Sequence, residues 1–72
     1  MANAMLRLRA VMTKTGLSRS TIYLMISRGR FPRQVKLGER SVGWLEHEVE
    51  EWIRAAVTQR DSAIAESMQS KR

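Results

Sequence analysis

The chain has no cysteine, one proline and one histidine among its 72 residues, and its aromatic side chains are two Trp, one Tyr and one Phe. Without cysteine, neither a disulfide nor a thiolate metal site can stabilise the fold, and a reducing cytoplasm suits the chain. No apolar run approaches the roughly 20 residues of a membrane helix. The first residues lack the pattern of a signal peptide. We therefore expect one cytoplasmic domain with no membrane association.

The residues that usually carry catalysis are also scarce. His47 stands among glutamates, and with no second histidine a zinc site would be very incomplete. No glycine-rich phosphate loop is present. A chain of this size buries only about 60% of its unfolded surface, which leaves little room for an enclosed pocket. The sequence therefore predicts no enzyme, no metal, no cofactor and no small-molecule substrate.

Positive charge is concentrated in the first part of the chain. Residues 1–45 carry nine Lys and Arg and a single Glu, whereas residues 46–72 carry four basic and six acidic residues. A polyanion would be attracted to the first part and repelled by the second, which gives binding an orientation. This division favours a nucleic acid as the partner over a basic surface that serves only solubility. Together with the helices described next, it predicts that the partner is double-stranded DNA.

Two helices joined by a tight turn are predicted near the N-terminus. Gly16 can adopt the left-handed conformation that ends a helix, and Ser18 can accept the free N–H groups that begin the next one. The first helix is expected over residues 9–15, where three apolar residues have the spacing of one buried stripe: Leu8, Val11 and Met12. Such a helix-turn-helix leaves its second helix free to enter a DNA major groove.

The second helix is expected from residue 18 or 19 to about residue 28, ended by Gly29. At 100° per residue its core side carries Ile22, Met25 and Ile26. The outward side is rich in groups that bond to phosphates or base edges, and its candidates for DNA contact are Arg19, Ser20, Tyr23, Leu24, Ser27 and Arg28. These features are typical of a recognition helix.

Within this set, Arg19 is the first candidate for a base edge or a phosphate, and Ser20 has a similar position. The Tyr23 hydroxyl can bond to a phosphate while its ring rests on the edge of the core. Weaker candidates for phosphate contact are Lys14, Arg28, Arg30 and Arg33.

A β-hairpin is predicted over residues 34–44, after Pro32 forces Phe31 out of helical geometry. Gly38 at the first central position fits a two-residue type II′ turn. That turn predicts the cross-strand pairs Leu37–Arg40, Lys36–Ser41 and Val35–Val42.

This register determines which hairpin residues face the core. The buried face would carry Val35, Val42 and Trp44, and the outward face Gln34, Lys36 and Ser41. A basic hairpin after a helix-turn-helix is a wing that can reach the DNA backbone or minor groove. Its candidates for DNA contact are Lys36, Arg40 and Ser41.

A third helix is expected over residues 46–60, with an acidic first turn that suits the positive end of a helix. We find no N-cap for it. Its apolar stripe predicts closure of the core: Leu45, Val49, Trp52, Ile53, Ala56 and Val57. The predicted domain covers residues 6–60, with flexible tails at 1–5 and 61–72. Ile64 and Met68 could instead extend the helix or meet a partner.

Four collinear motifs resemble the AlpA family of phage and prophage regulators, which is similar to excisionases and MerR-type winged helix-turn-helix domains. They are Thr-Gly-Leu-Ser-Arg-Ser-Thr-Ile-Tyr at 15–23, Gly-Arg-Phe-Pro at 29–32, Val-Lys-Leu-Gly at 35–38, and Val-Gly-Trp with Glu-Val-Glu-Glu-Trp at 42–44 and 48–52. The resemblance implies a transcription regulator that often activates an integrase or excision gene. Family members often carry a polar residue where this chain has Leu24, which could touch a thymine methyl or a protein neighbour instead.

The predicted fold is mainly α with a small β-hairpin: a winged helix-turn-helix of three helices and a two-stranded wing. The predicted function is sequence-specific DNA binding by a transcription regulator of the bacterial cytoplasm and nucleoid. The alternatives are an excisionase-like protein that bends DNA and a small protein-interaction adaptor with a basic surface. A single small domain contacts few bases, so cooperative binding of several copies is a further hypothesis, with Leu24, Ile64 and Met68 as candidate contacts.

Overall fold

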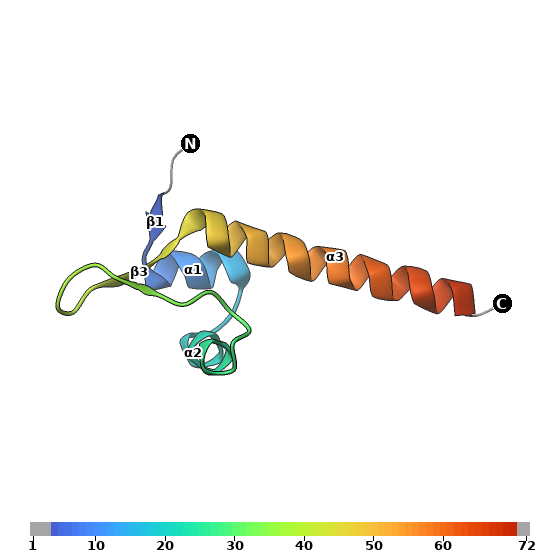
Figure 1. Ribbon diagram of the computed structural model, residues 1–72, viewed down its shortest axis with the longest axis horizontal. Helices are drawn as coiled ribbons and strands as arrows, with labels where there is room; N and C mark the ends of the chain where they lie inside the picture. Colours follow the sequence, from blue (N-terminus) through green and yellow to red (C-terminus); the bar gives the residue numbers. More distant parts are fainter. Residues whose placement is uncertain (1–3, 71–72) are drawn as a thin grey trace.

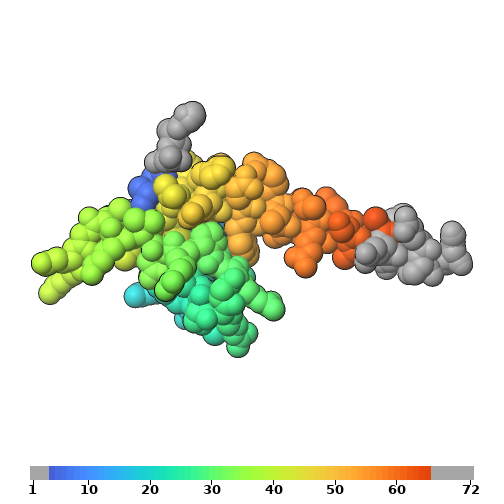
Figure 2. Space-filling model, viewed as in Figure 1, coloured from blue at the N-terminus to red at the C-terminus, as the bar shows by residue number. Residues whose placement is uncertain are grey.

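The computed structural model describes residues 4–70, with side chains described from 4 to 65. The elements in chain order are β1 (Met5–Leu6), α1 (Leu8–Thr15), α2 (Arg19–Ser27), β2 (Val35–Lys36), β3 (Val42–Leu45) and α3 (Glu46–Ser70). The three strands form one antiparallel sheet in the order β1-β3-β2. The molecule measures 56 × 29 × 19 Å, with the β2–β3 hairpin and the end of α3 at opposite ends and α2 projecting between them (Figures 1 and 2).

The turn between α1 and α2 confirms the predicted local chemistry. Gly16 has a φ of 75°, and its N–H donates to the Met12 carbonyl at 2.8 Å. Ser18 is extended, and its hydroxyl accepts the Thr21 N–H at 3.2 Å. The left-handed glycine ends α1 and the serine caps α2, so the two helices are joined by only three residues.

The end of α2 is also set by local rules. Gly29 has a φ of 69° and donates its N–H to the Ile26 carbonyl at 3.0 Å, while the Arg30 N–H donates to the Met25 carbonyl at 2.8 Å. These two bonds form a Schellman motif, which satisfies the last free carbonyls of the helix.

Five buried side chains form the core: Val11, Ile22, Phe31, Trp44 and Val49. They come from all three helices, from β3 and from the segment that links α2 to β2. Phe31 is a core residue that the sequence pattern did not predict. Its ring packs edge to face against Trp52, with ring centroids 5.0 Å apart.

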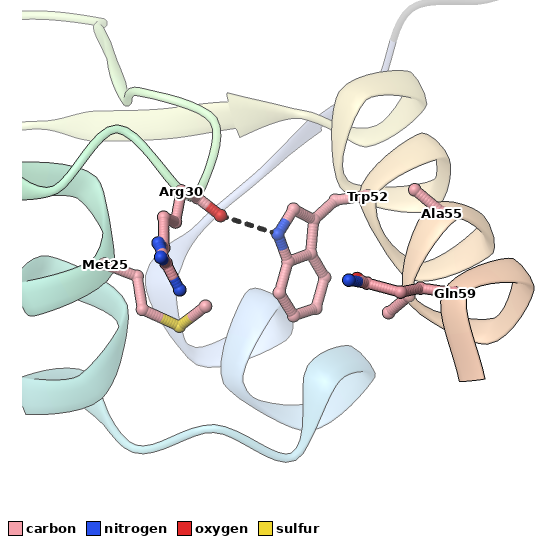
Figure 3. A pocket seen from close by; sticks show the side chains of 6 residues that line it. Met25, Arg30, Trp52, Ala55 and Gln59 are labelled. Atoms are coloured by element: carbon pink, nitrogen blue, oxygen red, sulfur yellow. Dashed lines mark hydrogen bonds between the residues drawn. The ribbon is translucent and has the colours of Figure 1, made fainter. Parts of the chain in front are cut away.

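The two indole groups hold the segment between α2 and β2. The Trp44 N–H donates to the Pro32 carbonyl at 3.0 Å, and the Trp52 N–H donates to the Arg30 carbonyl at 2.8 Å (Figure 3). Trp44 is fully buried, whereas Trp52 is half-buried beside a shallow hollow that Met25 lines from α2. Two carbonyl groups of the linking segment thereby have hydrogen-bond donors without regular secondary structure.

The start of α3 explains how a helix forms without a side-chain cap. It follows β3 directly, and the Glu46 N–H donates to the Ala4 carbonyl at 2.8 Å. Met5 pairs with Leu45 and Leu6 with Trp44, so β1 lies beside β3. The expectation of a loose N-terminal segment through residue 5 is therefore wrong at Met5, and the sheet has three strands instead of two.

The predicted end of α3 near residue 60 is also wrong, since the helix continues to Ser70. Residues 61–70 are helical, and residues 71–72 of the predicted tail lie outside the described part. Val49 is buried and Trp52 and Ile53 are half-buried, but Val57 is 42% exposed. The later part of α3 therefore extends beyond the body of the domain (Figure 2).

Candidate nucleic-acid interface

The outward face of α2 is open along its whole length. Ser20 and Arg28 are exposed, and Leu24 is 49% exposed between them. Ser27 is exposed as well, with its hydroxyl donating to the Leu24 carbonyl at 2.6 Å. Ile22 points to the opposite side and is fully buried. The predicted division of α2 into a core side and an outward side is confirmed.

Arg19 and Tyr23 link this outward face to the core. The Tyr23 ring is half-buried and packs edge to face on Trp44, with centroids 6.2 Å apart. The Arg19 guanidinium carbon lies 6.0 Å from the centre of the Tyr23 ring, at the outer limit of a cation–π contact. The buried Trp44 thus positions Tyr23, and Tyr23 lies beneath the exposed guanidinium of Arg19.

The hairpin has a different register from the predicted one. Lys36 lies opposite Val42 and Val35 opposite Gly43. The Leu37 N–H donates to the Ser41 carbonyl at 2.7 Å, which leaves a three-residue loop at residues 38–40. Gly38 is not among the glycines with positive φ, so the predicted type II′ turn and the three predicted pairs are wrong.

Gly43 fits the close packing of this register. A Cβ atom at residue 43 would stand 2.9 Å from Leu37 Cδ1 and 3.1 Å from the Leu6 carbonyl oxygen. The Leu37 side chain can rotate away from such an atom, but the Leu6 carbonyl belongs to the backbone of β1, which would have to shift by a few tenths of an ångström. The two-residue turn predicted from Gly38 takes no account of this close packing.

The new register exchanges the two faces of the first strand of the hairpin, while Val42 and Trp44 stay on the core side. Lys36 now shares the face of Val42 and Trp44, which is the side of the helices, whereas Val35 points to the outer face and is 39% exposed. The predictions that Val35 is buried and that Lys36 faces outward, away from the core side, are wrong. Arg40 is exposed in the loop, and Ser41 is half-buried.

Several basic side chains form ion pairs or hydrogen bonds within the molecule. The Lys14 ammonium lies 3.4 Å from a Glu50 carboxylate oxygen and 3.9 Å from one of Glu46. Arg7 Nε donates to the Val42 carbonyl at 3.1 Å. Lys14, a weaker candidate for phosphate contact, thus faces the acidic part of α3 instead.

Other cations form no ion pair within the part of the chain that the structure describes. All are exposed, and apart from Arg9 of α1 they belong to α2, the linking segment or the hairpin: Arg19, Arg28, Arg30, Arg33, Lys36 and Arg40. The first turn of α3, which carries Glu46 and Glu48, lies apart from α2 (Figure 1). The structure therefore keeps the separation of charge that the sequence shows.

Two features are absent from residues 4–70, a cluster of metal ligands and a membrane-spanning helix. No three His, Cys, Asp or Glu side chains come together there as metal ligands. None of the helices in this range has both the length and the apolar character needed to cross a membrane.

A helix-turn-helix whose exposed second helix lies beside a β-hairpin defines a mainly helical winged helix-turn-helix protein. Residues 4–58 match the sequence model of the family described as "Prophage CP4-57 regulatory protein (AlpA)", so the chain belongs to the AlpA family. This match includes every element of the fold up to the point where α3 leaves the body of the domain.

Two relatives support this membership. An uncharacterized protein, ORF88, of Enterobacteria phage P4 is 49% identical over 55 residues, which cover 76% of this chain and 62% of the phage protein. The DNA-binding transcriptional activator AlpA of Escherichia coli K12 is 44% identical over 54 residues, which cover 67% of this chain and 77% of that protein. The chain therefore spans less than two thirds of the length of the phage P4 relative.

Proposed function

We propose that this protein is a sequence-specific DNA-binding transcription regulator of the prophage type, acting in the bacterial cytoplasm on nucleoid or phage DNA. The observation that carries the proposal is the open face of α2, which stands clear of the core beside unpaired cations. The E. coli relative described as a DNA-binding transcriptional activator supports it.

In this proposal α2 enters the major groove and its residues divide into two roles. Arg19 and Ser20, in the first turn, contact base edges, and Leu24 offers an apolar contact to a thymine methyl. Ser27 and Arg28 continue this face toward the end of the helix. The Tyr23 hydroxyl bonds to a phosphate from a ring that Trp44 holds in place.

The hairpin is proposed to act mainly through charge. Lys36 and Arg40 neutralise phosphates next to the major groove, and Ser41 adds a hydrogen bond at the base of the loop. Contacts of this kind fix the position of the protein on the duplex and carry little sequence information. Since one small domain contacts few bases, we further propose that several copies bind repeated sites cooperatively.

The test begins with selection of the preferred site from a pool of random duplexes, followed by fluorescence anisotropy titrations at several salt concentrations. We expect an enriched motif and an affinity that falls steeply with salt, by about 0.9 in the log–log slope for each neutralised phosphate. Arg19→Ala should flatten the preference among sites, whereas Arg40→Ala should weaken binding to all sequences alike and lower the slope by roughly one.

The matched control is Arg54→Ala, which removes an arginine that is paired with Glu51 on α3, at 2.9 Å. It should leave both the slope and the site preference unchanged. Absence of duplex binding by the unaltered protein at low salt would refute the proposed function. Circular-permutation assays of the selected site, together with a promoter reporter, distinguish a regulator from a protein that only bends DNA.

A further inference from the structure

A groove separates the last turn of α2 from the β-hairpin. Its lining residues come from α2, from the linking segment and from both strands of the hairpin: Ile26, Arg33, Gln34, Lys36 and Val42. The volume of the groove is about 610 Å³. Arg33 and Lys36 are exposed, whereas Ile26, Gln34 and Val42 are half-buried, so the groove has an apolar floor and a cationic rim.

The charge of this groove has one sign. Neither Arg33 nor Lys36 forms an ion pair within the described residues, and no acidic side chain lines the groove. Two cations that form no ion pair among the described residues, three positions apart on the linking segment and on β2, favour an anion that extends along the groove. The Gln34 amide adds a group that can donate a hydrogen bond between them.

The register of the hairpin is what brings Lys36 to this place. Because Lys36 pairs with Val42, its side chain lies on the face of the sheet that looks toward α2. In the register predicted from the sequence, it would have been on the outer face. Arg33 reaches the same groove from the segment that Trp44 holds through the Pro32 carbonyl.

The length of α2 indicates what the groove would meet on DNA. Its nine residues span about 13.5 Å, which is close to the width of the major groove, about 12 Å. Recognition helices direct their N-terminal residues toward base edges. With Arg19 and Ser20 at the bases, the last turn of α2 reaches the rim of the major groove, where a phosphate strand runs.

We propose that one sugar–phosphate strand of the duplex lies in the groove between α2 and the hairpin, and that Arg33 and Lys36 bind its phosphates from the side of the linking segment and the hairpin. This inference rests on the proposed function. It adds the position of one phosphate strand on the protein and names Arg33 as a further residue that contacts DNA. Arg33 and Lys36 are the two phosphate-binding residues of this groove, which we call the clamp. The hairpin then contacts DNA with the face that looks toward α2 as well as with its loop.

The test measures the salt dependence of binding to the selected duplex for Arg33→Gln, Arg33→Lys and the double variant Arg33→Gln/Lys36→Gln. One lost phosphate contact lowers the log–log slope by about 0.9. Between 50 and 200 mM salt, Arg33→Gln should therefore lose about 3.5-fold less affinity than the unaltered protein, and the double variant about 12-fold less. Arg33→Lys should retain the slope, and Arg54→Ala should not change it.

A second measurement locates the contact on the DNA. Single phosphates of the selected duplex are replaced in turn by neutral methylphosphonates. Neutralising one or two phosphates on one strand should weaken binding by the unaltered protein but have no further effect on Arg33→Gln. A titration with inorganic phosphate at constant ionic strength distinguishes a site for the free anion, and it should leave the affinity for the duplex unchanged.

The outcomes separate the two proposals. Failure of the unaltered protein to bind any duplex removes both. Normal binding with an unchanged slope in Arg33→Gln, or methylphosphonate effects that are equal in the variant and the unaltered protein, overturns the clamp and leaves the proposed function standing. Competition by millimolar inorganic phosphate would mean that the groove is a site for a free anion.

Discussion

Replacing Trp44 by phenylalanine should destabilise the protein considerably more than the same replacement at Trp52. Trp44 is fully buried, and its N–H is the donor to the Pro32 carbonyl. Phenylalanine would leave that half-buried carbonyl without a partner, at a cost of about 1–3 kcal/mol. The smaller phenyl ring would also lose buried contacts of the indole, which should lower the free energy of unfolding by roughly a further 1–2 kcal/mol. The free energy of unfolding should therefore fall by about 2–5 kcal/mol.

This loss is large for a domain of this size. At about 0.05–0.15 kcal/mol per residue, 72 residues are stable by roughly 4–11 kcal/mol in total. Trp52 is the matched comparison, since it makes the same kind of bond to the carbonyl of Arg30, an exposed residue. Water can replace the Trp52 N–H, so Trp52→Phe should lose about 0.5–1.5 kcal/mol from the hydrogen bond. Because the Trp52 ring is only half-buried, the smaller ring should remove roughly 0.5–1 kcal/mol more, which makes about 1–2.5 kcal/mol in total.

The assay is urea unfolding of both variants and of the unaltered protein, followed by circular dichroism at 222 nm. The slopes of the free energy against urea should agree, so that a shift of the midpoint reports stability alone. Equal losses at the two positions, or a larger loss at Trp52, would refute this reasoning. Such a result would mean that the Pro32 carbonyl finds another donor when Trp44 is changed.

Two further predictions concern the hairpin and the helix-turn-helix. Gly43→Ala places a Cβ atom 2.9 Å from Leu37 Cδ1 and 3.1 Å from the Leu6 carbonyl oxygen, so unfolding in urea should show a loss of about 1–3 kcal/mol; an unchanged midpoint would contradict the observed register. Ser18→Ala removes the acceptor of the Thr21 N–H, which should cost about 1 kcal/mol and lower the melting temperature by roughly 4–8 °C. A Ser18→Asp variant, which keeps an acceptor, should melt close to the unaltered protein.

The helix-turn-helix was predictable because its boundaries depend on neighbouring residues. Gly16, Ser18 and Gly29 each act on backbone groups within a few positions, and each has the predicted role. The two sides of α2 followed from helical periodicity in the same way. The candidate residues on α2 are accordingly exposed where the sequence placed them, and whether they contact DNA is left to the experiments above.

The hairpin was mispredicted because local turn chemistry competes with packing between distant residues. Gly38 favours a tight turn by itself, but in the observed pairing Gly43 lies close to Leu37 and to Leu6 of β1, which is distant in the sequence. Gln34 received no role from the sequence, yet it lines the groove with Arg33 and Lys36. A three-residue loop at Gly38 would have been the alternative to consider, since it places Lys36 on the inner face.

The observed structure also differs from the prediction at both ends of the domain. β1 has only two residues and no strand signal of its own, and it exists because β3 offers a partner across nearly 40 residues. The apolar stripe of α3 fades after Val57, so its pattern predicted an early end, whereas the helix continues to Ser70.

The amino-acid sequence by itself therefore determined the positions of α1 and α2, the capped turn between them and the separation of cationic and acidic segments. Each of these follows from groups that are close along the chain or from simple charge. Only the tertiary structure decided the register of the hairpin, the third strand, and the side on which Lys36 meets Arg33. Those features depend on how closely backbones far apart in the sequence can approach each other, and a glycine such as Gly43 shows its importance only when the neighbouring strands are in place.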